Sequence, residues 1–333
     1  MHMADALLSP AVGGAMWLAS AAALAVCARR LRECADDALV PLMGVLGAFV
    51  FAAQMVNFAI PGTGSSGHLG GGLLLAVLLG PHAALIVIAS VLTVQALFFA
   101  DGGLLALGAN IFNLGVLPCF VAYPLVYRWL AGTAASRRRI GWAAVAAALF
   151  GLQLGALGVV LQTVASGIAS LPLQTFLWLM LPIHAPIGLV EGVATAAILG
   201  FIRQAQPELL APVPPRQAPA RPAKRLLVAL AVAAGVTAAG LSALASAAPD
   251  GLEWAIEKTA GAAALHAPAT GLPGWLAALQ ERTAWLAEYQ LPAHAAGAGV
   301  PGEAGTALAG LVGGTVTLLL VAGAVALLRR RQR

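Results

Sequence analysis

The sequence predicts an all-α integral membrane protein with about nine transmembrane helices. Hydrophobic residues make up 60% of its 333 residues, charged residues only 9%, and the mean hydropathy is +0.90. A soluble domain carries about 25% charged residues, because its surface must be solvated. The composition therefore excludes a soluble enzyme, a disordered regulator and a nucleic-acid-binding protein, and it makes the lipid bilayer a partner of the chain.

The first span sets the orientation of the chain. A transmembrane helix needs about 20 apolar residues, and Lys and Arg gather in cytoplasmic loops. Residues 11–27 form a span that begins outside, because Arg29, Arg30 and Arg32 follow it and no basic residue precedes it. A cleaved secretory signal needs a basic segment ahead of its apolar core, so we expect this segment to be retained.

The remaining spans follow from the apolar runs between the charged residues. They are expected at 39–60, 69–80, 82–100, 104–127, 141–168, 174–202, 225–247 and 305–328. The run at 69–80 is short, about 18 Å at the helical rise against a hydrocarbon core of ~30 Å. Of the 18 Lys and Arg residues, all but Lys258 and Arg282 then lie on the cytoplasmic side. The N-terminus is predicted outside and the C-terminus inside.

Composition divides the chain into two membrane parts. Residues 1–204 contain seven of the expected spans. Residues 205–224 are rich in Pro and Ala, which is typical of a stiff, extended linker. Residues 225–333 contain two spans separated by a polar segment, 248–304, on the outer side.

The first residues, Met1-His2-Met3, predict a chelate for a divalent metal ion. The α-amine, the His2 backbone nitrogen and His2 Nδ1 can close two fused rings around one ion. Ni²⁺ and Cu²⁺ favour such planar nitrogen ligands. This set leaves the plane one ligand short. For residues 1–3 taken alone, a histidine after the start codon without any metal role is the simpler explanation.

His68 is the candidate for the missing ligand. It follows a Gly/Ser-rich loop, residues 62–67, on the outer side where Met1 also lies. Ionisable groups at a membrane-embedded site are costly and usually functional. His68 is either the fourth ligand or an ordinary interfacial histidine, and the residues alone leave both open.

Other polar residues stand in apolar surroundings, where each needs a partner. A metal-ligating histidine generally donates its second ring N–H to a nearby acceptor, so these residues either support the metal ligands or join helices. The candidates for the supporting role are Asp5, Ser65, Ser66, Gln95, Asn110, Asn113, His184 and Glu191. Asp101 belongs to the wider set of such polar residues.

Two alternative functions come from the same sequence. Gly64-Ser65-Ser66-Gly67 matches the Gly-x-Ser-Gly pattern of rhomboid intramembrane serine proteases, with His184 as the base, but this leaves Met1-His2 unexplained. A stand-alone metal channel or secondary transporter is the other alternative. No phosphate-binding loop of the Gly-x-x-x-x-Gly-Lys-Ser/Thr type occurs in the sequence, so the chain is not expected to hydrolyse ATP by that route.

Several spaced motifs stand out in the first part of the chain. They are Met1-His2-Met3, Asn57 to Gly62, Ser66-Gly67-His68-Leu69, Gln95 to Gly103, Leu107 to Asn113, and His184-Ala185-Pro186 with Glu191. Together they resemble the CbiM/NikM family, the substrate-binding (S) components of energy-coupling-factor nickel and cobalt importers. The resemblance covers about residues 1–203. It departs from the family pattern at Ala4 and Ala6, near the metal-binding N-terminus.

The second part resembles NikN-type proteins. Pro249-Asp250-Gly251-Leu252-Glu253 matches their PDGLE signature, and Tyr289 with Pro292 is similar to a motif ahead of their last span. The chain is thus similar to a fusion of a seven-helix S-component bundle with a two-helix NikN-like module.

The resemblance implies a function and a set of partners. It implies that Met1, His2 and His68 bind Ni²⁺, or alternatively Co²⁺, as the transported substrate, without any bound organic cofactor. It implies a CbiQ/NikQ-like membrane coupling protein and CbiO/NikO-like ATPase subunits, so that the chain itself is not an enzyme. It also implies a location in the inner membrane of a prokaryotic cell.

Overall fold

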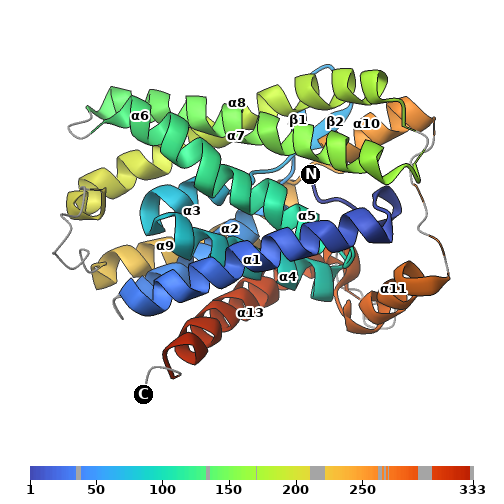
Figure 1. Cartoon of the computed structure of the whole chain (residues 1–333). Helices are drawn as coiled ribbons and strands as arrows, with labels where there is room; N and C mark the ends of the chain where they lie inside the picture. The colour runs from blue at the N-terminus through green and yellow to red at the C-terminus, as the bar shows by residue number, and fades with distance from the viewer. Residues whose placement is uncertain are drawn as a thin grey trace.

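Helices stand at each predicted span position (Figure 1). The computed structural model describes residues 1–34, 39–132, 136–169, 171–210, 222–261, 265, 268, 270–291 and 302–330. The span helices are α1 (Pro10–Cys34), α2 (Leu39–Met55), α3 (Gly72–Leu79), α4 (Pro81–Phe99), the continuous helix Leu107–Ala131 that includes α5 (Leu107–Ile111) and α6 (Arg128–Ala131), α7 (Arg137–Ser166), α8 (Leu173–Ala205), α9 (Lys224–Ala239) and α13 (Gly302–Arg330).

Among the described residues, seven helices are long and apolar enough to cross a membrane, and α2, with 17 residues, is slightly shorter. The exception is α3, whose 8 residues span only about 12 Å. Gly71 and Gly80, both with φ of +77°, bound this helix, because only glycine adopts that conformation without strain. Pro81 then begins α4, so the α3–α4 pair forms a broken helix within the bundle.

The central helix of the bundle is α4. It is apolar all round, as expected for a helix buried on every side, and it contacts α1, α2, α5 and α13. By contrast, α1 leaves much of its surface exposed, as a lipid-facing helix does. The core therefore joins the two parts of the chain, since α13 comes from the second part.

The second span ends earlier than expected and is followed by a hairpin. The second span was expected to reach residue 60, but α2 ends at Met55 and residues 58–60 form strand β1. Strand β1 (Phe58–Ile60) pairs antiparallel with β2 (Ser65–Gly67), and Gly62 and Gly64 take positive φ in the turn. This small hairpin, which the α-helical prediction lacked, carries the chain to His68.

The second part of the chain packs on helices and on the hairpin of the first part. Both α9 and α13 pack on α2, and α10 (Gly251–Ala260) packs on α8 and β2. The helix α11 (Gly271–Thr283) and a 3-10 turn, Ala287–Tyr289, contact α4. Of the linker predicted at 205–224, residues 211–221 lie outside the described residues.

Candidate metal centre

The N-terminal segment is buried inside the bundle and is held there through its backbone. Asn110 Oδ1 accepts a hydrogen bond from Met3 N at 2.8 Å, and Asn110 Nδ2 donates to Met3 O at 3.2 Å. Gly103 N also donates to Met3 O, at 3.0 Å. Asn110 therefore fixes the backbone next to His2, as a neighbouring strand would.

Asp5 provides a second anchor. Its Oδ1 accepts a hydrogen bond from Ala106 N at 2.9 Å. Burial raises the pKa of Asp5, and the backbone N–H groups of Ala106 and Leu105 oppose that rise. A side chain on Gly103 would collide with the Asp5 carboxylate and backbone. Asp5 thus binds the first helical turn to the 103–106 loop.

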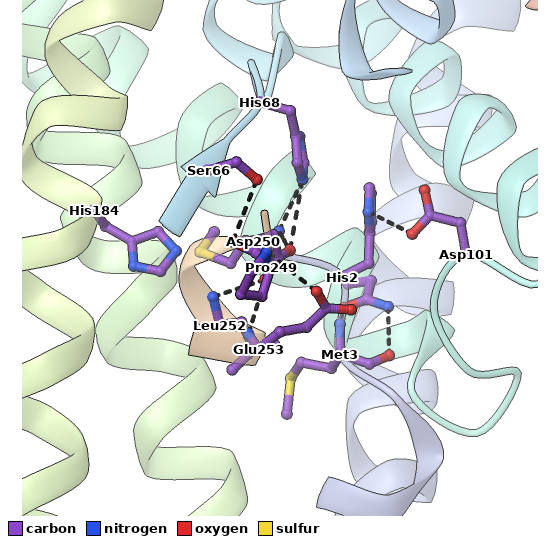
Figure 2. A network of polar contacts seen from close by, with 12 residues as sticks. His2, Met3, Ser66, His68, Asp101, His184, Pro249, Asp250, Leu252 and Glu253 are labelled. Atoms are coloured by element: carbon purple, nitrogen blue, oxygen red, sulfur yellow. Dashed lines mark hydrogen bonds and ion pairs between the residues drawn. The ribbon is translucent and has the colours of Figure 1, made fainter. Parts of the chain in front are cut away.

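The Met1 amine lies 2.8 Å from His68 Nε2. Figure 2 shows His68 and Asp250 facing each other in this centre. His68 Nδ1 donates to Leu69 O at 3.1 Å, so Nε2 presents its lone pair to the amine. Burial, together with the nearby N-terminal ammonium and His2, lowers the pKa of His68 to about 3, which keeps the ring neutral and able to bind a metal. Two neighbouring ligands, each ~2.0 Å from an ion at right angles, would be about 2.8 Å apart.

His2 is brought to the same place but in a different orientation. Its ring is stacked on that of His68, with centroids 5.0 Å apart and planes 7° from parallel. Its Nδ1 lies 2.9 Å from Asp101 Oδ1, and its Nε2 is buried with no hydrogen-bond partner among the described residues. Because imidazole lone pairs lie in the ring plane, chelation through Nδ1 requires the ring to turn.

The carboxylate of Glu191 fixes the turn that follows His68. It accepts hydrogen bonds from Gly70 N at 3.0 Å and Gly71 N at 3.1 Å. Gln54 Nε2 donates to Gly70 O at 2.7 Å. A supporting role for Glu191, predicted from its polarity, therefore takes the form of a clamp between α8 and the His68 turn.

Ser65 and Ser66 bind the second part of the chain. Ser66 Oγ donates to Ala248 O at 2.7 Å and Ser66 N donates to Pro249 O at 2.8 Å. Ser65 Oγ lies 3.3 Å from Pro249 O. The PDGLE segment therefore runs alongside strand β2, where Ser66 and Asp250 form an isolated parallel bridge.

The other predicted supporting residues lie around this cluster. Asn113 and Gln162 pair reciprocally, at 2.8 and 3.0 Å, and so join the helix Leu107–Ala131 to α7. Gln95 is fully buried beside the Tyr289 hydroxyl. His184 Nδ1 donates to Met180 O at 2.7 Å. Asn110, Asp5 and Glu191 thus hold the ligand-bearing segments through short hydrogen bonds. Asn113 mainly joins two helices, although its Nδ2 also lies 3.8 Å from Met3 Sδ.

Ser66 and His184, the pair that the serine-protease alternative requires, do not form a hydrogen bond with each other. That chemistry requires a serine hydroxyl hydrogen-bonded to a base. The Ser66 hydroxyl instead donates to Ala248 O, and His184 Nε2 has no partner among the described residues. His184 faces a cavity of about 10 Å³ that Met1, His68 and Asp250 also line, roughly the space of one water.

Asp250 is a residue of the centre that sequence reasoning missed. Its Oδ2 lies 2.6 Å from the Met1 amine, while its Oδ1 accepts from Leu252 N and Glu253 N and caps α10. Burial opposes ionisation, but the N-terminal ammonium and His68 outweigh it and hold the pKa of Asp250 below its usual range. In the sequence, Asp250 stood out only as part of the PDGLE signature; its capping box with Glu253 is a finding of the structure.

Asp101 was also missed as a site residue. It was recognised as a polar residue in apolar surroundings, and the structure pairs it with His2 Nδ1 and with the Tyr289 hydroxyl. Among the described residues, no three His, Cys, Asp or Glu side chains gather around one metal position.

Comparisons with known proteins identify the family to which the chain is similar. Residues 2–209 match the family model of CbiM, the cobalt uptake substrate-specific transmembrane region, and residues 224–330 match the PDGLE domain. A NikMN-type fusion of Archaeoglobus fulgidus is 35% identical over 323 residues, 96% of each chain. The fused nickel transport protein NikMN of Rhodobacter capsulatus is 34% identical, over 84% of this chain and 86% of its own.

A crystal structure of a transition metal transporter has the same fold over 62% of this chain and 95% of its own, with a TM-score of 0.56 and 30% identity. Fold and comparisons together define a multi-pass membrane component of transition-metal transport. The chain belongs to the CbiM family and carries its PDGLE domain in the same polypeptide, like the fused NikMN proteins.

Proposed function

We propose that this chain is the substrate-capture subunit of an energy-coupling-factor importer and that its cargo is Ni²⁺, with Co²⁺ as the alternative. The metal binds through the Met1 amine, the His2 backbone nitrogen, His2 Nδ1 and His68 Nε2. The observation that carries the proposal is the 2.8 Å separation of the Met1 amine from His68 Nε2. These groups are 67 positions apart in the chain, and no local pattern requires them to meet.

The chemistry of these ligands favours nickel. All four are nitrogen atoms, and Ni²⁺ accepts planar nitrogen coordination with a deprotonated amide. Binding releases protons from the amine and the amide, so affinity depends on pH. The amine must leave its contact with Asp250, and the metal then takes over as the positive charge beside that carboxylate.

Orientation and partners follow from the charges and from the motifs. The distribution of Lys and Arg favours an extracytoplasmic N-terminus and a cytoplasmic C-terminus in the inner membrane of a prokaryote. Residues 1–204 supply the metal ligands, and residues 205–224 form the linker. Residues 225–333 form the second part, which covers the metal centre on its outer side. Energy comes from CbiO/NikO-like ATPases through a CbiQ/NikQ-like coupling protein.

The test is metal titration of the purified full chain with Ni²⁺ and with Co²⁺, read with the d–d absorption of the complex. A planar nickel complex is yellow and diamagnetic. His2→Gln removes the imidazole that closes the second chelate ring and should abolish this spectrum. His82→Gln serves as the control, because His82 lies at the start of α4, at the opposite end of that helix from Asp101.

Unchanged nickel binding in His2→Gln would rule out the proposed ligands. Uptake by cells that lack every ATPase partner would instead favour the stand-alone transporter. These two results are separate, because the first concerns the ligands and the second concerns the source of energy.

A further inference from the structure

Two hydrogen bonds connect the second part of the chain to His2. The Tyr289 hydroxyl donates to Asp101 Oδ2 at 2.6 Å, and Asp101 Oδ1 lies 2.9 Å from His2 Nδ1. Burial and the Asp101 carboxylate raise the pKa of Tyr289 well above its usual range, so the phenol keeps its proton and donates it. One carboxylate thus joins the phenol to the imidazole.

Tyr289 is held firmly in this place. Its ring stacks on Phe99, with centroids 4.9 Å apart, and meets the edge of Phe51 at 6.2 Å. Its φ of +59° lies in the left-handed region. This conformation costs a bulky residue free energy, which the contacts around Tyr289 must offset. The phenol is therefore aimed by the packing of its ring.

The same segment also holds the loop that carries Asp101. Gln280 Nε2 donates to Ala96 O at 2.8 Å and to Gly102 O at 2.7 Å. Leu286 N donates to Phe98 O at 3.1 Å. Contacts on both sides of Asp101 thus come from residues 280–289, in the second part of the chain.

We propose that Tyr289 is a positioning residue for the metal ligand His2 and that it acts through Asp101. The inference rests on the proposed function and adds a residue to it. A half-turn of the His2 ring about its Cβ–Cγ bond exchanges Nδ1 with Cδ2 and Cε1 with Nε2. That turn frees Nδ1 for the metal and brings Nε2–H to the edge of the ring that faces Asp101.

In this account Asp101 holds His2 in both orientations. In the present structure it accepts from Nδ1, and with metal bound it accepts from Nε2, as a carboxylate commonly does behind a metal-bound histidine. Tyr289 keeps the carboxylate in one place during the turn. The second part of the chain then controls how well His2 is oriented for chelation.

The test uses Tyr289→Phe, which keeps the stacked ring and removes only the hydroxyl. Nickel dissociation constants are measured for the full chain, Tyr289→Phe, Asp101→Asn and the double variant. Loss of an outer hydrogen-bond partner weakens metal binding by roughly 10–100-fold, and we expect about tenfold for Tyr289→Phe. The double variant should bind no more weakly than Asp101→Asn, because both changes act through one carboxylate.

Tyr127→Phe is the matched control, since Tyr127 is buried and stacked on Tyr123 in another part of the chain. Nickel affinity should be unchanged in this variant. Equal affinity of Tyr289→Phe and the unmodified chain, or additive losses in the double variant, would overturn the proposal.

A metal-free measurement separates this proposal from the proposed function. In protein with ¹⁵N-labelled histidine, the His2 signal, identified by its loss in His2→Gln, reports which ring nitrogen carries the proton. Tyr289→Phe should shift that signal whether or not nickel binds. If the chain binds neither Ni²⁺ nor Co²⁺, the proposed function is wrong. If the His2 signal does not shift in Tyr289→Phe, the proposed role of Tyr289 is wrong.

Discussion

The carboxylate of Asp250 lies 2.6 Å from the α-amine of Met1, although 249 positions separate them in the sequence. His68 Nε2 is 4.0 Å from the same carboxylate oxygen. The PDGLE segment therefore brings a negative charge to the amine and the imidazole that the proposed chelate uses. A dication carries two positive charges beside this carboxylate, whereas the ammonium that it replaces carries one.

The first prediction concerns this charge. Asp250→Asn should weaken nickel binding by about tenfold, because a carboxylate about 4 Å from the ion contributes at least ~1 kcal/mol even at high dielectric. Asn caps a helix about as well as Asp, so α10 should remain folded. Equilibrium titration measures the effect, and Glu257→Gln on the same helix is the control. Unchanged or tighter binding in Asp250→Asn would contradict this role.

Glu191 gives a second prediction. In Glu191→Gln the amide group can no longer accept both hydrogen bonds from Gly70 and Gly71, which leaves a buried N–H without a partner. Such a loss costs about 1–3 kcal/mol, and it should lower the unfolding temperature and weaken nickel binding together. Glu208→Gln, at an exposed position, should change neither. A stable variant with full affinity would show that the clamp is dispensable.

The helices were predictable because each depends on a local run of apolar residues, whereas several parts of the centre were not. The hairpin at 58–67 was missed because its glycines and serines indicated only a loop. The contact of Tyr289 with Asp101 joins residues 188 positions apart, and no periodicity reports it. Met1, His2 and His68 were identified as candidates because their chemistry is visible in the sequence, but the orientation of the His2 ring was not.

The third prediction tests the packing of the N-terminal segment. Gly103→Ala places a methyl group against Asp5, so either the N-terminal segment or the 103–106 loop must move. Overpacking of this kind costs about 1–3 kcal/mol, and we expect nickel affinity to fall about tenfold or more, since 1.4 kcal/mol is a factor of ten. The matched control is Gly14→Ala, whose methyl group meets no atom within 4 Å.

Titration of both glycine variants under identical conditions gives a direct comparison. Gly14→Ala should bind nickel like the unmodified chain and unfold at the same temperature or slightly higher, because Ala is the better helix former. Equal affinities for Gly103→Ala and Gly14→Ala would mean that the N-terminal segment tolerates displacement, which the fused-ring chelate does not allow.

The last prediction compares the two buried histidines that line the cavity beside Met1. His68 presents Nε2 to the amine at 2.8 Å, whereas His184 is bonded to Met180 O through Nδ1 and lies across the cavity. His68→Gln should therefore weaken nickel binding more than about 100-fold, beyond the range for outer partners, and remove the planar spectrum. His184→Gln should preserve that spectrum and lose less than about tenfold, the lower limit for outer partners. The reverse order of losses would assign the fourth ligand to His184.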